Sequence, residues 1–107
     1  MQIPQITVEE LKRMQTEQEP FTLIDVREID EWNFCHIEKS ESMPLSKINT
    51  WADTLDPETH YVFMCHHGAR SMQAAMIARS RGVERVTNLA GGIDAWSRRI
   101  DSSVSCY

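Results

Sequence analysis

The chain of 107 residues has the length of one compact domain, and its composition, 41% hydrophobic and 25% charged, is ordinary for a folded globular protein. Its formal net charge of −5 argues against binding to nucleic acid or to an acidic membrane, because both require a basic surface. An anionic ligand therefore needs a local positive site on an acidic protein.

The amino terminus and the three cysteines bear on where the protein works. Residues 1–6 lack the basic start and apolar run of a secretory signal, and no stretch reaches the ~20 apolar residues that span a bilayer. Cys35, Cys65 and Cys106 are odd in number and share no repeated spacing, so we expect no disulfide framework. Reduced thiols are typical of the cytoplasm, which the sequence therefore predicts as the location.

The first half of the chain is predicted to contain short helices around one strand. Thr7, with a glutamate three residues later, is a capping-box pattern that begins a helix. Residues 21–26 form an apolar, β-rich run typical of a buried strand, and residues 30–34 fit one or two helical turns. Ser46 is predicted to cap a helix with one apolar face, closed by the Asp-Pro pair at 56–57.

The second half shows a strand–helix–strand–helix order. Residues 61–64 are a short apolar run, and residues 70–81 form the clearest helix, with Gly82 at the position that ends it. Residues 86–89 are predicted as a strand, after which Gly91-Gly92 turns the chain into a last helix. This alternation predicts an α/β fold with a small, mostly parallel sheet.

The domain organisation is predicted to be simple. The sequence has no internal repeat, no low-complexity stretch and no linker, so residues 1–100 are predicted to form a single domain. Residues 101–107 are polar and follow neither the helical nor the strand period, which predicts a flexible tail.

The segment that joins the strand at 61–64 to the following helix is the candidate site. Its residues are Cys65, His66, His67, Gly68, Ala69, Arg70 and Ser71. Ligands of open α/β sheets collect where strands lead into helix N-termini, which offer unpaired N–H groups and a positive dipole end. Gly68 allows the loop to curl inward and add its own amides. We therefore expect a lowered pKa for the Cys65 thiol and a nucleophilic thiolate at neutral pH.

The neighbours of Cys65 each have two interpretations. Arg70 opens a helix where the dipole disfavours a cation, so it either meets an anionic substrate or forms a salt bridge with an acidic neighbour. His66 and His67 either tune the thiolate or are simply solvated. Ser71 either belongs to the anion-binding loop or caps the helix.

Two further groups bear on the pocket and on metals. Asp25 and Arg27 straddle a strand end, which favours a structural ion pair, with Arg27 lining the pocket as the alternative. Cys35-His36 together with Cys65-His66-His67 superficially suggests zinc, but contiguous residues of one tight loop do not readily converge on a tetrahedral ion, and no Cys-x-x-Cys pair exists. We therefore expect no metal and no cofactor.

Four motifs follow one another over nearly the whole chain. They are Asp-Val-Arg-Glu at 25–28 with His-Ile at 36–37, Met-Pro-Leu at 43–45, Cys-x-x-Gly-x-Arg-Ser at 65–71, and Leu-Ala-Gly-Gly-x-x-x-Trp at 89–96. In their content and order the chain resembles the rhodanese family. Residues 38–40, Glu-Lys-Ser, depart from the Pro-Gly-Ala that the family often has, and we expect this to alter a surface turn only.

The resemblance implies a fold and a reaction. The fold is a three-layer α/β domain in which helices flank the sheet on both faces. The reaction is sulfur transfer: the Cys65 thiolate takes the outer sulfur of a donor such as thiosulfate, and the resulting persulfide passes it to cyanide, a small thiol or a protein thiol.

Two other functions are also compatible with the sequence. A phosphatase or arsenate reductase uses a similar loop with five residues between cysteine and arginine, whereas only four separate Cys65 from Arg70, and the smaller ring suits a sulfur atom better than a phosphate. A persulfide carrier or binding module that acts on a partner protein has the same loop as the enzyme.

Overall fold

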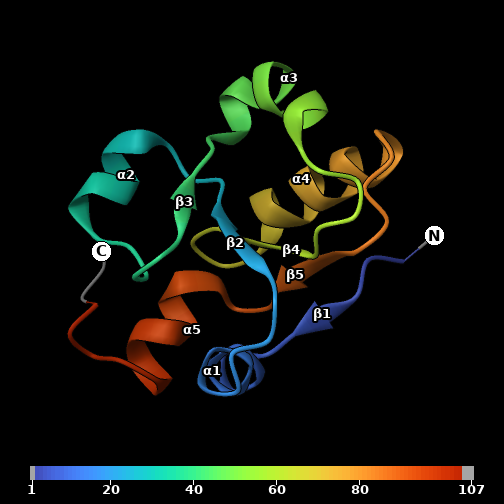
Figure 1. Cartoon of the computed structure of the whole chain (residues 1–107). Coiled ribbons are helices and arrows are strands. Elements are labelled where there is room, and N and C mark those ends of the chain that lie inside the picture. Colours follow the sequence, from blue (N-terminus) through green and yellow to red (C-terminus); the bar gives the residue numbers. More distant parts are fainter. Residues whose placement is uncertain (1, 105–107) are drawn as a thin grey trace.

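Five parallel strands form one sheet in the computed structural model, which describes residues 2–104 (Figure 1). In spatial order they are β1 (Gln5–Ile6), β5 (Val86–Leu89), β4 (Tyr61–Met64), β2 (Thr22–Asp25) and β3 (Glu41–Ser42). Every pairing between neighbours is parallel. The predicted α/β fold with its small parallel sheet is therefore confirmed.

Helices cover both faces of the sheet (Figure 1). One face packs against α1 (Val8–Thr16) and α5 (Gly92–Arg99), and the other against α3 (Ile48–Trp51) and α4 (Ala69–Ser80). The short helix α2 (Ile29–Phe34) follows β2 and has no buried residue of its own. The three layers that the resemblance implied are thus present.

The central strand β4 decides which face carries the candidate nucleophile. All four of its residues are buried, as expected of a parallel strand covered on both sides. Val62 and Met64 belong to the core under α1 and α5, whereas Phe63 and Cys65 belong to the core under α3 and α4. Because side chains alternate along a strand, Cys65 points to the side from which α4 begins.

The helix predicted from Ser46 differs from the structure. Residues Leu45–Lys47 and Ala52–Thr54 are turns of 3-10 helix that flank α3, and its N-terminal cap is Lys47, without a side-chain hydrogen bond. Ser46 does not cap the helix because its hydroxyl donates to Glu28 Oε1 at 2.8 Å. By contrast, Thr7 caps α1 as predicted, and its hydroxyl oxygen accepts the Glu10 N–H at 3.2 Å.

β1 and β3 have two residues each, too few to show an alternating pattern, so the sequence did not reveal them. Of the predicted tail, residues 101–107, only 101–104 are described, and Val104 packs against the core under α1 and α5. Within residues 2–104, no helix has the length and hydrophobicity needed to cross a membrane.

Candidate active site

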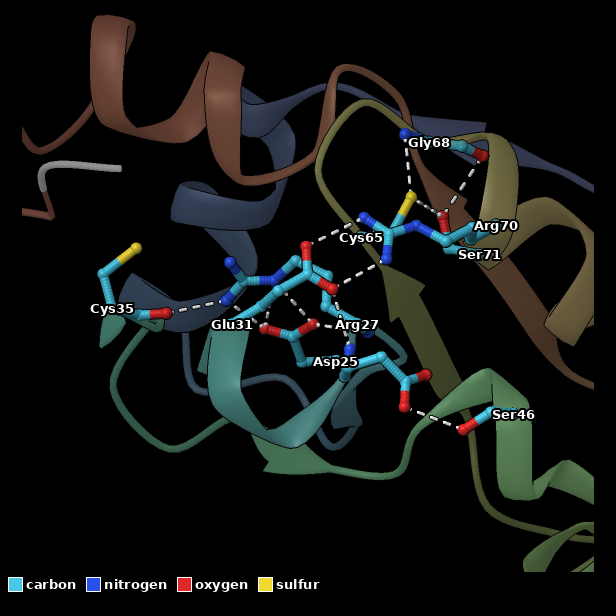
Figure 2. A network of polar contacts seen from close by, with 10 residues as sticks. Asp25, Arg27, Glu31, Cys35, Ser46, Cys65, Gly68, Arg70 and Ser71 are labelled. Atoms are coloured by element: carbon cyan, nitrogen blue, oxygen red, sulfur yellow. Dashed lines mark hydrogen bonds and ion pairs between the residues drawn. The ribbon is translucent and has the colours of Figure 1, made fainter. Parts of the chain in front are cut away.

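The loop that begins at Cys65 joins the carboxyl end of β4 to the start of α4. Gly68 is the residue before the helix, and its φ of +117° lies in the left-handed region that side chains other than glycine rarely adopt. Its N–H points back toward the end of β4 and donates to the sulfur of Cys65, as Figure 2 shows. The glycine therefore gives the loop the inward curl expected from the sequence.

Cys65 is 1% exposed and its Sγ faces hydrogen-bond donors of the loop. The Gly68 N–H donates to Sγ at 3.0 Å, and the Ser71 hydroxyl lies 3.5 Å from it (Figure 2). Burial alone raises the pKa of the thiol, but the Ser71 hydroxyl and the N–H groups of Ser71, Gly68 and Arg70 outweigh burial and lower that pKa. The lowered pKa favours a thiolate in the loop.

Behind Ser71 lies a buried asparagine that the sequence analysis did not single out. Asn88, in β5, accepts the Ser71 hydroxyl at 2.5 Å through Oδ1 and donates to the Gly68 carbonyl at 3.1 Å through Nδ2. Ser71 is thus the third residue of α4 rather than its cap. Its single proton can serve Asn88 Oδ1, the Gly68 carbonyl or Sγ, but only one at a time. Asn88 therefore holds both Ser71 and Gly68 in position.

Ser71→Ala is expected to raise the pKa of Cys65, because it removes the donor that contributes most to lowering it. The thiolate fraction at neutral pH then falls, and the acid limb of the pH–rate profile of alkylation moves to higher pH. Iodoacetamide alkylation of Cys65 followed over pH measures this shift. Ser80→Ala, at the exposed far end of the same helix, is the matched control and leaves the profile unchanged. A superimposable Ser71→Ala profile would contradict the assignment.

The start of α5 closes the other side of the loop. The Ile93 N–H donates to the Cys65 carbonyl at 2.9 Å and the Asp94 N–H donates to the His66 carbonyl at 3.1 Å. Gly92 makes this approach possible: its φ is +56°, and a Cβ there would lie 2.5 Å from the His66 oxygen and in still closer contact with that of Cys65. The loop is therefore held between the N-termini of α4 and α5.

Gly92→Ala is expected to destabilise the fold by about 2–3 kcal/mol and to slow alkylation of Cys65, because the new methyl group collides with backbone that cannot retreat. Urea unfolding and the alkylation rate measure the two effects. Gly82→Ala is the matched control: its φ of +105° is also strained, but a Cβ there meets nothing within 4 Å. Equal losses in the two variants would show that backbone strain, not contact with the loop, accounts for the effect.

Arg70 forms the salt bridge that the sequence analysis gave as one of its two interpretations. Its Nη1 and Nη2 donate to Glu31 Oε1 and Oε2 at 2.8 and 3.2 Å, a two-pronged contact between α4 and α2 (Figure 2). The arginine side chain is 39% exposed and that of Glu31 24%. The pair therefore lies at the rim of the loop rather than in its floor.

Arg27 is the buried partner of Asp25. Its Nη2 and Nε donate to the Asp25 carboxylate at 2.7 and 3.0 Å, and Nη2 also reaches the Cys35 carbonyl at 2.7 Å. Both members of the pair are fully buried. The structural ion pair favoured by the sequence is thus present, and Arg27, with no exposed surface, does not line an open pocket.

The two histidines of the loop stand at different depths. His66 is half-buried, and burial together with the neighbouring charge of His67 lowers its pKa. His67 is exposed, with Nε2 3.5 Å from the Asp94 carboxylate. The side chain of Ala69 is also exposed, at the rim of the loop. The lowered pKa disfavours the protonated, positively charged form of His66 in the loop.

The described residues do not bring together the zinc ligands considered from the sequence. The one cluster of metal-binding groups among residues 2–104 consists of His66, His67 and Asp94, whose ligand atoms lie within 4.8 Å of one another. Asp94 also accepts Arg98 Nη2 at 2.6 Å, so a cation there competes with an existing ion pair. Cys35 is not part of the cluster.

The cysteines differ from the expectation that all are reduced. Cys35 is disulfide-bonded, so that expectation is wrong for this residue. Cys65 is a free thiol, and Cys106 lies outside the described residues. The odd number of cysteines did not reveal this bond, because three cysteines allow one disulfide and one free thiol.

A groove of about 620 Å³ lies away from the loop. It is lined by the first residues of β2 and β3, Thr22 and Glu41, and by Gln15 of α1. In a parallel sheet the amino ends of the strands lie at the edge opposite the carboxyl ends, so this groove is remote from Cys65.

Comparisons with known proteins agree with this geometry. The model of the rhodanese-like domain family matches residues 7–99. The chain is 38% identical over 89 residues to the rhodanese-like/PpiC domain-containing protein 12, chloroplastic, of Arabidopsis thaliana, covering 79% of this chain and 30% of that protein. It is 30% identical to the putative sulfur carrier protein YrkF of Bacillus subtilis, covering 92% and 54%. The chain thus spans about half or less of these two relatives.

Relatives of similar length also exist. The thiosulfate sulfurtransferase GlpE of Actinobacillus pleuropneumoniae is 29% identical, with 77% of this chain and 76% of that protein covered. The structure of the human single-domain sulfurtransferase TSTD1 superimposes with a TM-score of 0.80 at 26% identity, covering 92% and 98% of the two chains.

Proposed function

Because the chain belongs to the rhodanese-like domain family, we propose that it is a sulfurtransferase that moves a sulfane sulfur through a persulfide on Cys65. The observation that carries this proposal is the Gly68 N–H at 3.0 Å from a Cys65 Sγ whose pKa is lowered. A ring of fixed donors around one sulfur stabilises an anion there without further reorganisation. The loop residues from His66 to Ser71 are proposed as its anion-binding frame.

With thiosulfate as donor, the reaction is a displacement at sulfur. The Cys65 thiolate attacks the outer sulfur, a new S–S bond forms, and the old S–S bond breaks with its electron pair leaving on sulfite. The terminal sulfur of the persulfide carries the negative charge and takes the place of the thiolate before the loop donors. An acceptor, cyanide or a thiol, then attacks this sulfur, and Cys65 leaves as the thiolate.

The burial of Cys65 restricts what can react. With 1% of the residue exposed, Sγ favours small reagents that present the reacting atom in an unhindered position. An outer sulfane sulfur meets this requirement, whereas four intervening residues between Cys65 and Arg70 leave a small ring for a tetrahedral phosphate. We therefore propose that the chain does not hydrolyse an aryl phosphate, and an assay with such a substrate is expected to show no turnover above buffer.

The test is mass spectrometry of the intact protein after incubation with thiosulfate. The expected product is an adduct of one sulfur atom on Cys65, which cyanide removes as thiocyanate. A protein that remains unmodified by thiosulfate and by an alkyl persulfide, while iodoacetamide still alkylates Cys65, would overturn the proposal. The alkylation control shows that the thiol was reactive.

A carrier role is the second candidate, favoured by the similarity to a putative sulfur carrier protein. In that case the acceptor is a protein thiol, and turnover with cyanide is slow although Cys65 is loaded by a single donor equivalent. The cytoplasmic location stays a prediction, and its support from reduced thiols is confined to Cys65.

A further inference from the structure

We infer that Glu31 is a specificity-determining residue: by holding Arg70 in an ion pair at the rim of the loop, it disfavours dianionic donors such as thiosulfate relative to monoanionic persulfides. This inference rests on the proposed sulfur transfer through Cys65. It concerns the choice of donor, which the loop alone does not specify.

The contact between Glu31 and Arg70 occupies the face of the guanidinium that an anion would use. Two donors of Arg70 meet the two carboxylate oxygens of Glu31 at 2.8 and 3.2 Å. This parallel arrangement is also the one by which arginine binds sulfonate-like or phosphate oxygens. An entering oxyanion therefore has to compete with a carboxylate that is already in place.

Glu31 is held in position by its own helix. Its Oε1 also accepts the Glu28 N–H at 2.9 Å in the capping box that begins α2. The Glu28 side chain is in turn fixed by the Ser46 hydroxyl at 2.8 Å. Because these contacts orient the Glu31 carboxylate independently of Arg70, the ion pair costs less side-chain entropy than a typical surface pair.

The other charged groups near the loop do not supply a positive charge that would offset Glu31. Arg27 and Arg70 are the two arginines whose charges act on His66, and Arg27 is buried against the Asp25 carboxylate. On the other side, the carboxylate of Asp94 faces His67. Each arginine that acts on the loop is therefore balanced by a carboxylate, and the loop stabilises charge by its amides.

This balance discriminates between donors by charge. Thiosulfate carries two negative charges, and a sulfonate that binds Arg70 has to displace the Glu31 carboxylate from the guanidinium. An alkyl persulfide carries at most one, which resides on the terminal sulfur that the amides bind. In that reaction the Cys65 thiolate attacks the terminal sulfur, the S–S bond of the donor breaks, and an alkyl thiolate leaves with the electron pair, so charge is conserved.

The test compares the rate of Cys65 loading by thiosulfate and by an alkyl persulfide in Glu31→Gln and in wild type. Glu31→Gln keeps the shape but removes the charge, so the thiosulfate rate constant is expected to rise about 3–5-fold, through a lower KM, while the persulfide rate is unchanged. Glu31→Gln/Arg70→Ala is expected to lose this gain. If the substitution instead loosened α2 in general, the loading rates with thiosulfate and with the alkyl persulfide would change by the same factor, and the inference would be overturned.

Asp53→Asn is the matched control. It removes the same charge and releases Arg81 from its 3.0 Å ion pair, but at the far end of α4, roughly 16 Å of helix from Arg70. The control is expected to leave the donor ratio at the wild-type value. If both donors load Cys65 and Glu31→Gln does not change their ratio, the inference about Glu31 is overturned alone; if neither donor loads Cys65, the proposed function falls with it.

Discussion

Cys65→Ser is expected to lower sulfur transfer by at least about 10³-fold while leaving the fold intact. The hydroxyl ionises far above neutral pH, so the loop donors have no anion to stabilise, and an oxygen cannot form the persulfide bond. Gly68 N–H, which donates to Sγ at 3.0 Å, can donate to the smaller Oγ instead, so no buried donor has to lose its acceptor. Thiocyanate formation from thiosulfate and cyanide measures the loss.

The fold of the Cys65→Ser variant is tested separately by thermal unfolding and by the circular dichroism of the folded state. We expect a melting temperature within a few degrees of wild type, since the substitution changes one buried atom. Turnover equal to wild type in a correctly folded variant would remove Cys65 from the mechanism. Lost turnover with an unfolded chain would call for Cys65→Ala as the second variant.

The local structure of the loop that carries Cys65 was predicted correctly. The apolar run at 61–64, the glycine at 68 and the helix that follows are contiguous, and each has a local cause: β propensity, a left-handed φ, and helical spacing. The thiol pKa moves in the expected direction because the donors come from the same loop and the same helix turn. The local structure of a loop can be predicted without the rest of the fold when the hydrogen-bond donors around its cysteine lie within a few residues of it.

The residues that the sequence did not identify come to the loop from elsewhere in the chain. Asn88 is 17 residues from Ser71, and Glu31 is 39 residues from Arg70. A polar residue in a short strand and a glutamate on a surface helix have no local signal that distinguishes them. The parallel sheet, by placing the carboxyl ends of β2, β4 and β5 at one edge, brings them together.

The same reasoning explains the error at Ser46. A serine before a run of apolar residues at helical spacing is a cap by local criteria. In the fold, however, Glu28 lies beside it, and the Ser46 hydroxyl donates to that carboxylate instead. A partner 18 residues away thus decides which hydrogen bond the hydroxyl makes. Local capping rules fail where tertiary structure supplies an ionised acceptor, because charged acceptors form the stronger bond.

Asp25→Asn is expected to destabilise the fold by about 3–5 kcal/mol, because it leaves the buried charge of Arg27 without its carboxylate. In the native protein the Asp25 carboxylate accepts from Nε, Nη2 and the backbone N–H of Arg27, at 2.7–3.1 Å. An amide of the same size keeps some of these contacts but cannot neutralise the guanidinium. Urea unfolding, compared at constant m-value, measures the loss.

Two comparisons separate loss of charge balance from loss of packing. Asp53→Asn removes a carboxylate from an arginine at the surface, where 72% of the Asp53 side chain is exposed, and is expected to cost at most about 1 kcal/mol. Asp25→Leu/Arg27→Met removes both buried charges and is expected to recover much of the stability, because apolar pairs of similar volume often replace buried ion pairs. A double variant no more stable than Asp25→Asn would show that hydrogen-bond geometry, including the Arg27 contact with the Cys35 carbonyl, matters more at this position than charge balance.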